Sequence, residues 1–93
     1  MTRVSVITPC HQAAAYIDEM LDSVTAQTLT DWEHVVVDDG SPDDSADRVM
    51  RRLELEPRLR LVRQANSGAI AARNRGFDVS DRTTEYLLFL DAD

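Results

Sequence analysis

The sequence of 93 residues predicts an α/β protein with a mostly parallel sheet between two layers of helices. Short apolar runs rich in β-branched residues alternate with segments of helical hydrophobic spacing, and these helical segments are roughly ten to fifteen residues long. Polar residues follow most of the predicted strands. Strands that alternate with helices in this way indicate right-handed crossovers and the order β-α-β-α-β-α-β.

The first predicted strand is Arg3–Thr8, a run rich in Val and Ile. It ends at Pro9, because proline has no N–H to donate to the ladder. A helix follows from about Ala13 to Gln27, since its apolar residues recur at i, i+3, i+4 and i+7 and leave the acids on the opposite face. These apolar residues are Ile17, Met20, Leu21 and Val24.

The second predicted strand is Trp32–Asp38, and a second helix is expected directly after it. Ser41 is suited to the N-cap, Pro42 to the first helical position, and Asp44 follows as an acid in the first turn. Pro57 prevents this helix from continuing.

The last three predicted elements are a strand, a helix and a strand. Leu59–Arg63 alternates apolar and charged residues, as a strand at the sheet edge would. A helix is expected over Ser67–Asp78. Glu85–Leu90 is almost continuously apolar, which is typical of a strand buried on both faces.

The orientation of the third helix is open from sequence alone. If its helical stripe faces the sheet, two polar side chains need a partner or face a ligand crevice; the stripe consists of Ile70, Arg73, Asn74 and Phe77. In the alternative orientation Arg73 is in solvent, and the packed residues are Ala69, Ala72 and Phe77.

Composition excludes some classes of function. Ten arginines, no lysine and seventeen acids give a formal net charge of −7, which argues against broad nucleic-acid binding. The single cysteine, Cys10, has no internal disulfide partner, and no zinc-ligand spacing is present. No run is long enough for a signal peptide or a spanning helix, so we expect a soluble segment.

Polar groups follow the first, second and fourth predicted strands: Thr8-Pro9, then Asp38 to Ser41, then Asp91-Ala92-Asp93. The carboxyl ends of parallel strands meet at one rim, where ligands of such sheets bind. Asp38 and Asp39 are equally well explained by turn chemistry. Asp91 and Asp93, at i and i+2, can both direct carboxylates at one ion, although a D-x-D pair also arises by chance.

Taken together, these motifs resemble family 2 glycosyltransferases along nearly the whole chain. The matching segments occur in the family's order: Val4 to Pro9, Ser23 to Trp32 with Gln27-Thr28, Val36 to Ser41 as V-x-D-D-G-S, Asn66 to Gly68 with Ala72 to Gly76, and Tyr86 to Asp93. The chain departs from the family at Cys10-His11-Gln12, where a Tyr-Asn or similar pair is common. We expect no catalytic role for Cys10 or His11.

The resemblance implies a fold, an activity and a set of site residues. The fold is a Rossmann-like, truncated GT-A fold with strand order 3-2-1-4. The activity is inverting, metal-dependent transfer of a sugar from a UDP-linked donor to a hydroxyl of a saccharide, lipid or protein acceptor, as in cell-wall or polysaccharide synthesis. The implied nucleotide-binding residues are Thr8, Pro9, Asp39, Asn66, Arg73 and Asp91.

Within that set, the resemblance assigns individual roles. Thr8 and Pro9 would border the base, Asp39 would accept a hydrogen bond from a uracil-like ring, and Asp91 would reach the ribose or a metal-bound water. Asp93 would be the metal ligand. Carboxylates repel a diphosphate, by roughly 4 kcal/mol for unit charges about 4 Å apart at an effective dielectric near 20, unless Mn²⁺ or Mg²⁺ bridges them.

The general base of such an enzyme would lie beyond Asp93. We therefore expect residues 1–93 to be the N-terminal, nucleotide-sugar-binding part of a transferase domain, inactive alone and prone to self-association through the exposed last strand. We expect a cytoplasmic location, at the inner membrane face if the full-length protein attaches there.

Three alternatives remain open. In a phosphatase of the haloacid dehalogenase type, Asp91 would be the nucleophile and Asp93 an acid, but that motif normally opens a domain. A sugar-nucleotide nucleotidyltransferase would need a glycine-rich basic loop that Pro9 to Ala15 lacks. A truncated or degenerate module could bind a nucleotide without transferring anything.

Overall fold

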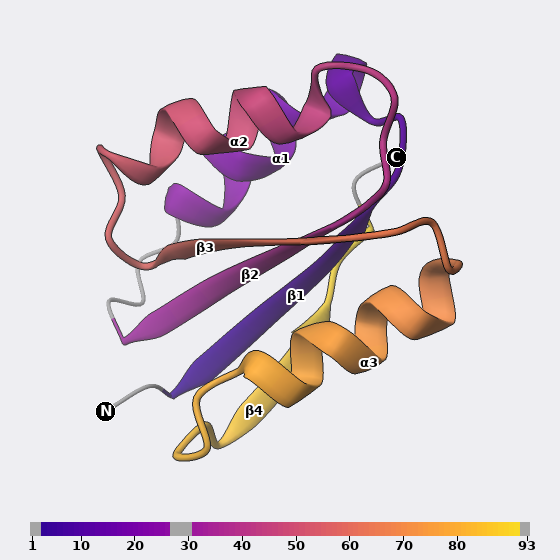
Figure 1. Ribbon diagram of the computed structural model, residues 1–93. Coiled ribbons are helices and arrows are strands. Elements are labelled where there is room, and N and C mark those ends of the chain that lie inside the picture. Colours follow the sequence, from indigo (N-terminus) through magenta and orange to yellow (C-terminus); the bar gives the residue numbers. More distant parts are fainter. Residues whose placement is uncertain (1–2, 27–30, 92–93) are drawn as a thin grey trace.

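The computed structural model describes residues 3–26 and 31–91. Its sheet contains β1 (Val4–Cys10), β2 (Trp32–Asp39), β3 (Leu59–Gln64) and β4 (Tyr86–Phe89), all parallel in the order β3-β2-β1-β4. The helices are α1 (Ala14–Thr25), α2 (Ser45–Leu53) and α3 (Ala69–Val79). Helices α1 and α2 cover one face of the sheet and α3 the other (Figure 1). The predicted α/β fold, its strand order and the edge position of β3 are confirmed.

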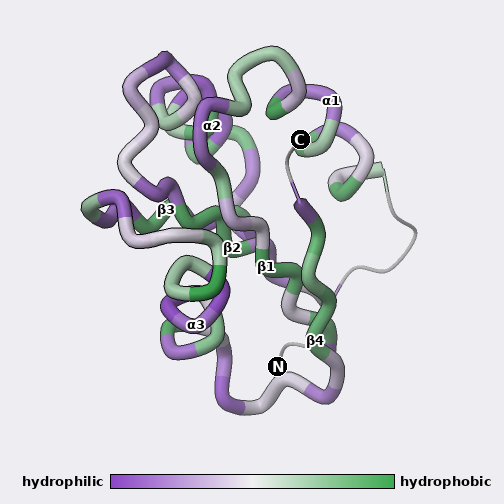
Figure 2. The backbone as a smooth tube through the Cα atoms, turned by 90° about the vertical axis from the view of Figure 1, so that its right-hand side faces the viewer, coloured by the Kyte–Doolittle hydropathy of each residue, from purple (hydrophilic) through white to green (hydrophobic). Residues whose placement is uncertain are grey.

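The larger part of the core lies between the sheet and the α1/α2 layer. Alternate residues of each strand face that layer, and apolar side chains of α1 pack onto them. The buried residues of this cluster are Val6, Cys10, Ala13, Ile17, Met20, Leu21, Val24, Trp32, Val36, Val49 and Leu59. Figure 2 shows the hydrophobic segments concentrated in the central strands, with hydrophilic segments on the helices around them.

Arginines of α2 pair with acids of α1 across the surface of this layer. Arg48 lies 2.8 Å from Asp18, and Arg52 lies 2.6 Å from Asp22. Such exposed pairs contribute at most about 1 kcal/mol each. They account for part of the arginine content without any external partner.

Helix α3 approaches the opposite face through small residues. Ala72 is fully buried against Val35 and Val37, and a Cβ added at Gly76 would lie only 2.3 Å from Ile7 Cγ2. The predicted stripe is therefore wrong for Ile70 and Phe77, which are 74% and 46% exposed. The helix is rotated so that its smallest side chains, rather than its largest, contact the sheet.

Three other sequence predictions are corrected by the structure. Strand β1 continues through Pro9 to Cys10 rather than ending at Pro9. Helix α2 begins at Ser45 rather than at the predicted cap Ser41, whose hydroxyl instead accepts the backbone N–H of Gln12 at 3.0 Å. The Asp43 carboxylate accepts the Ser45 N–H at 3.1 Å and so terminates the preceding turn.

Strand β4 is exposed along its whole length rather than buried on both faces. It pairs with β1 alone, and Tyr86, Leu87, Leu88 and Phe89 are 41% to 58% exposed. The Tyr86 N–H donates to Arg3 O and the Leu90 N–H to Ile7 O, both at 3.0 Å. Since N–H groups alternate sides along a strand, those of Leu87 and Phe89 point away from β1. The outer edge of β4 is thus available for pairing.

No helix in the described ranges is long and apolar enough to cross a membrane.

Candidate functional site

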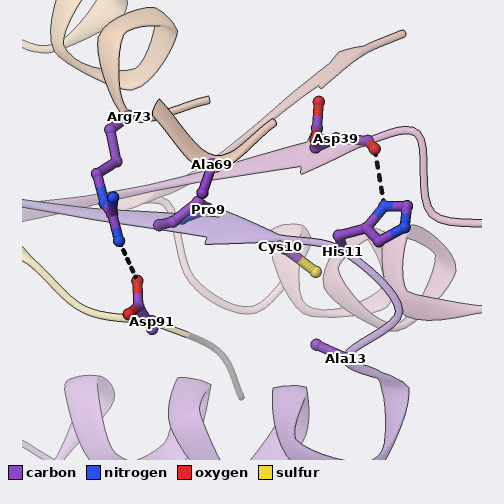
Figure 3. A pocket seen from close by; sticks show the side chains of 8 residues that line it. All are labelled: Pro9, Cys10, His11, Ala13, Asp39, Ala69, Arg73 and Asp91. Atoms are coloured by element: carbon purple, nitrogen blue, oxygen red, sulfur yellow. Dashed lines mark hydrogen bonds and ion pairs between the residues drawn. The ribbon is translucent and has the colours of Figure 1, made fainter. Parts of the chain in front are cut away.

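A pocket of about 210 Å³ lies at the rim formed by the carboxyl ends of β1, β2 and β4. Figure 3 shows Arg73 and Asp91 toward one end and Asp39 and His11 toward the other, with Pro9 and Ala69 between them. The complete lining is Pro9, Cys10, His11, Ala13, Asp39, Ala69, Arg73 and Asp91. The predicted convergence of the three strand ends is therefore confirmed for Pro9, Asp39 and Asp91.

Asp39 is the last residue of β2 and is only 4% exposed. Its Oδ1 accepts the Ser67 N–H at 2.8 Å and the Gln64 Nε2–H at 2.9 Å, and its Oδ2 accepts the Gly68 N–H at 2.9 Å. Burial acts to raise the pKa of Asp39, but these three donors and the nearby His11 outweigh it and lower that pKa below its ordinary value. Asp39 is therefore an anion that holds the start of α3.

The backbone carbonyl of Asp39 joins two further loops. His11 Nδ1, on the loop after β1, lies 2.9 Å from this oxygen, and Asn66 Nδ2, on the loop after β3, lies 3.2 Å from it. Gly40 follows with a positive φ of 70°, and a Cβ there would lie 2.8 Å from Asn66 N. Asp39 and Gly40 thus hold the loops that form one end of the pocket in contact.

The other end of the pocket contains an ion pair between helix and strand. Arg73 Nη2 on α3 lies 3.1 Å from Asp91 Oδ1, just beyond β4. The two side chains are 37% and 54% exposed, so both remain accessible from solvent. Two orientations of α3 were open from the sequence. The structure agrees with the one in which Arg73 points at the crevice, but Asn74 is exposed and does not line the pocket.

Thr8 does not reach this pocket with its side chain, in contrast to the prediction. Successive strand residues alternate faces, so Pro9 lines the pocket while Thr8 faces α1 and is fully buried. The Thr8 hydroxyl lies 2.8 Å from His34 Nε2 and contacts the Met20 sulfur at 3.8 Å. Its role is to satisfy a buried histidine.

The same alternation separates the two adjacent acids of β2. Asp38 is buried on the α2 side, where its Oδ2 lies 3.8 Å from Arg63 Nε and its Oδ1 has no hydrogen-bond partner. Burial raises the pKa of the neighbouring Cys10 thiol, and the Asp38 charge raises it further. At neutral pH the Cys10 thiol is therefore protonated, which disfavours a nucleophilic role.

The carboxylate of Asp91 is the type of oxygen ligand that Mg²⁺ and Mn²⁺ prefer. Within residues 3–26 and 31–91, no three His, Cys, Asp or Glu side chains are grouped so as to hold a metal ion. Asp93, the predicted metal ligand, lies outside the described residues, as does the Gln27-Thr28 pair of the second matched segment. The described residues thus fit one part of a divalent-metal site.

His11 and Cys10 were not predicted to line the pocket, and Gln64 was not predicted to be a partner of Asp39. A signal for the first two was available, because Cys10 ends β1 and His11 directly follows it, at the rim. Gln64 gave no such signal, since its role depends on β3 lying beside β2 in register with Asp39.

Comparison with known proteins identifies glycosyltransferases to which this chain is similar. A glycosyltransferase YibD of Escherichia coli is 40% identical over 91 residues, which are 98% of this chain and 26% of YibD. The structure of Staphylococcus aureus TarS 1-349 in complex with UDP-GlcNAc superposes with a TM-score of 0.89 at 31% identity, covering 99% of this chain and 27% of TarS 1-349.

A third similar protein is the mannosyltransferase PcManGT of Pyrobaculum calidifontis, whose structure contains GDP-Man and Mn²⁺. The TM-score is 0.79 at 33% identity, and the match covers 85% of this chain and 24% of PcManGT. TarS and PcManGT share the GT-A fold with this chain. The chain spans about a quarter of the length of each of the three proteins.

The family model for glycosyl transferase family 2 matches residues 5–93, almost the whole sequence. The chain belongs to glycosyl transferase family 2.

Proposed function

We propose that residues 1–93 form the nucleotide-sugar-binding part of a metal-dependent, inverting glycosyltransferase whose donor is a UDP-linked sugar. The observation that carries this proposal is that Asp39, Arg73 and Asp91 line one pocket at the carboxyl rim of a parallel sheet. Ligands of open α/β sheets bind at this rim. The complex of TarS with UDP-GlcNAc supports a UDP-linked donor, and that of PcManGT with GDP-Man supports the wider class.

In this proposal the ends of the pocket have different tasks. The base enters between Pro9 and the Asp39 end, with Asn66 at its border, and the ribose and diphosphate extend toward Asp91. Arg73 is the only cationic side chain among the described lining residues, so it would contact the diphosphate. A contact between Asp39 and the base stays a prediction, and it would use the acceptor capacity that Oδ2 retains beside Gly68.

Asp91 and Asp93 would hold Mn²⁺ or Mg²⁺ together with phosphate oxygens. When bound, the cation neutralises the diphosphate and stabilises charge on the departing nucleoside diphosphate. Arg73, already 3.1 Å from Asp91, would exchange this partner for a phosphate oxygen. The contribution of these residues is therefore to keep oppositely charged groups at the place where the diphosphate lies.

Transfer itself requires groups that we place after Asp93. A general base there would remove the proton from an acceptor hydroxyl of a saccharide, lipid or protein. Residues 1–93 alone would then bind a nucleotide without transferring a sugar. The alternative, a module that binds a nucleotide and never catalyses transfer, predicts binding that does not depend on the metal carboxylates.

Calorimetric titration with UDP, in the presence and absence of Mn²⁺, tests the proposal. We expect binding that requires Mn²⁺ and is lost in Asp93→Ala, because one carboxylate of the metal site is removed. Glu54→Ala is a matched control, since Glu54 is exposed at the end of α2 remote from the rim. Binding that is indifferent to Mn²⁺ and to Asp93→Ala would favour the binding module, and absence of UDP binding would refute both.

A further inference from the structure

Glu33 is a buried acid near the start of β2, at the end of the sheet opposite to the pocket. Its carboxylate contacts three other segments of the chain. The Ser5 hydroxyl of β1 donates to Oε2 at 2.6 Å, the backbone N–H of Asp81 donates to the same oxygen at 2.5 Å, and Arg60 Nη1 of β3 lies 3.2 Å from Oε1. A buried charge is costly unless it is paired and hydrogen-bonded, and these contacts meet both conditions.

Two of these partners connect Glu33 to the end of α3. Asp81 comes directly after Ser80, the C-cap of the helix. Arg60 Nη1 donates to the carbonyl oxygen of Val79, the last helical residue, at 2.5 Å. A cation at this place also interacts favourably with the C-terminal end of the helix dipole. Glu33 thus holds both the backbone that leaves α3 and the arginine that caps it.

The third partner connects Glu33 to the start of β4. Because the Ser5 hydroxyl gives its single proton to Glu33, the Thr84 hydroxyl, 2.5 Å away, must donate to Ser5 Oγ. Thr84 lies two residues before β4 begins, and this strand leads to Asp91. Glu33 is therefore linked to both elements that carry the ion pair between Arg73 and Asp91.

Asp39 and Glu33 hold the two ends of α3 from one strand. Side chains alternate along a strand, so both acids lie on the face of β2 that α3 covers (Figure 1). The step from Glu33 to Asp39 extends about 20 Å at about 3.3 Å per residue. The 11 residues of α3 extend about 17 Å. The helix thus fits between the two acids with little slack, and Arg73 lies between its ends.

We propose that Glu33 is a positioning residue for the diphosphate end of the site. It fixes the end of α3 and the start of β4, and so determines how Arg73 is placed opposite Asp91. This proposal rests on the proposed function, in which Arg73 contacts the diphosphate. Glu33 itself touches no ligand, and its effect on binding passes through Arg73. A shift of the helix along its axis weakens that contact, because hydrogen bonds weaken steeply when they are misaligned.

A double-mutant cycle tests this proposal. The affinity for UDP is measured by calorimetry with Mn²⁺ for the wild type, Glu33→Gln, Arg73→Ala and the double variant. Glutamine keeps the shape of the side chain but has one acceptor oxygen, so either the Asp81 N–H or Arg60 loses its partner. If Glu33 acts through Arg73, its substitution has no further effect once Arg73 is absent.

We expect Glu33→Gln to weaken UDP binding about threefold to fivefold when Arg73 is present, and less than about twofold in the Arg73→Ala background. A role in stability alone gives the same factor in both backgrounds, or leaves the affinity unchanged. Either of these results overturns the proposal.

Val24→Ala is the control for stability. Val24 is buried near the end of α1, in the cluster on the other face of the sheet, and truncating it destabilises the fold. The affinity of this variant for UDP should equal that of the wild type. A loss of affinity as large as that of Glu33→Gln would show that destabilisation by itself impairs binding, and the proposal would fail.

Arg60→Met provides a second variant if Glu33→Gln does not fold. It removes one partner of Glu33 from the side of the cluster that is half exposed, and we expect UDP binding to weaken about twofold. Arg51→Met, at an exposed arginine of α2, is its control and should bind UDP as the wild type does. Equal affinities of the two variants would contradict the positioning role.

A ligand-free measurement separates this proposal from the proposed function. If the wild type does not bind UDP, the proposed function fails, and the position of the ion pair is still observable. The backbone amide signals of Arg73 and Asp91 in ¹H–¹⁵N spectra should shift in Glu33→Gln and stay in place in Val24→Ala. Unshifted signals in Glu33→Gln would show that Glu33 does not position this pair.

Discussion

The carboxylate of Asp39 accepts the backbone N–H of Gly68 at 2.9 Å, and α3 begins at the next residue, Ala69. A negative charge at this position interacts favourably with the N-terminal end of the helix dipole. Asp39, for which the family resemblance implies a contact with the base, thus also has a structural task. It positions α3, and with it Arg73, relative to β2.

Replacing Asp39 by asparagine should lower the free energy of unfolding by about 1–2 kcal/mol. Asparagine has one acceptor oxygen, so at least one of the N–H groups of Ser67 and Gly68 loses its partner. Urea unfolding at pH 7 measures this effect. As a control, Asp78→Asn replaces an exposed acid near the other end of α3 and should change the free energy of unfolding by less than about 0.5 kcal/mol. Equal effects of the two substitutions would contradict the capping role.

Replacing Arg73 by alanine should weaken UDP binding about tenfold while changing stability by less than about 1 kcal/mol. The ion pair with Asp91 is partly exposed, which explains the small effect on stability. The lost cation explains the effect on binding. Arg75→Ala is the control, because Arg75 lies on the same helix, is exposed and does not line the pocket. Calorimetry that finds both variants equally impaired would argue against a specific contact.

His34 predicts a pH dependence of stability. It is 1% exposed, and burial lowers its pKa to about 4 from an ordinary value of 6.5. Because its folded pKa is depressed, the unfolded state binds the proton more readily, and stability falls as the pH decreases from about 6.5 toward 4. The difference corresponds to roughly 3 kcal/mol across that window.

Urea unfolding between pH 7.5 and 4.5 should show this loss in the wild type and not in His34→Gln, whose amide can still contact Thr8. Parallel pH profiles of the two proteins would show that His34 is not the responsible group. The Asp39 contribution is lost only at lower pH, since its folded pKa is below the ordinary aspartate value.

The outer edge of β4 predicts self-association. Leu87 and Phe89 present unpaired N–H groups beside exposed apolar side chains, and such edges pair with other strands. We expect the apparent mass of residues 1–93 in light scattering to rise with concentration and Leu87→Lys to suppress the rise. Leu55→Lys, at an 85% exposed leucine on the α2–β3 connection, should leave it unchanged. A monodisperse wild-type monomer at high concentration would refute this prediction.

The strand order and the rim were predictable because they follow from the alternation of strands and helices and from where polar residues occur. The side of the sheet on which the Thr8 side chain lies was not recognised. Because side chains alternate along a strand, Thr8 lies on the same side as the buried Val6 and Cys10 and faces α1. The family resemblance assigned Thr8 a place beside the base, whereas in the structure its hydroxyl forms a hydrogen bond with the buried His34.

The rotation of α3 could not be obtained from hydrophobic periodicity. That periodicity selects the largest apolar side chains, whereas the helix contacts the sheet through Ala72 and Gly76. The close approach of α3 to the sheet depends on Ile7 and Val37, which lie beneath Gly76 and come from distant parts of the sequence. The contact of His11 with the Asp39 carbonyl likewise joins the loop after β1 to the end of β2, so no local sequence pattern predicts it.

The backbone contact between Gly40 and Asn66 leaves no space for even a methyl group between the two loops that carry them. A displacement of one loop must therefore displace the other, along with the start of α3 that follows Asn66. A ligand bound at the base end of the pocket would then change the position of Arg73, one helical turn into α3, without any contact between the base and that arginine. Affinity for the base and affinity for the diphosphate would accordingly not be independent quantities in this protein.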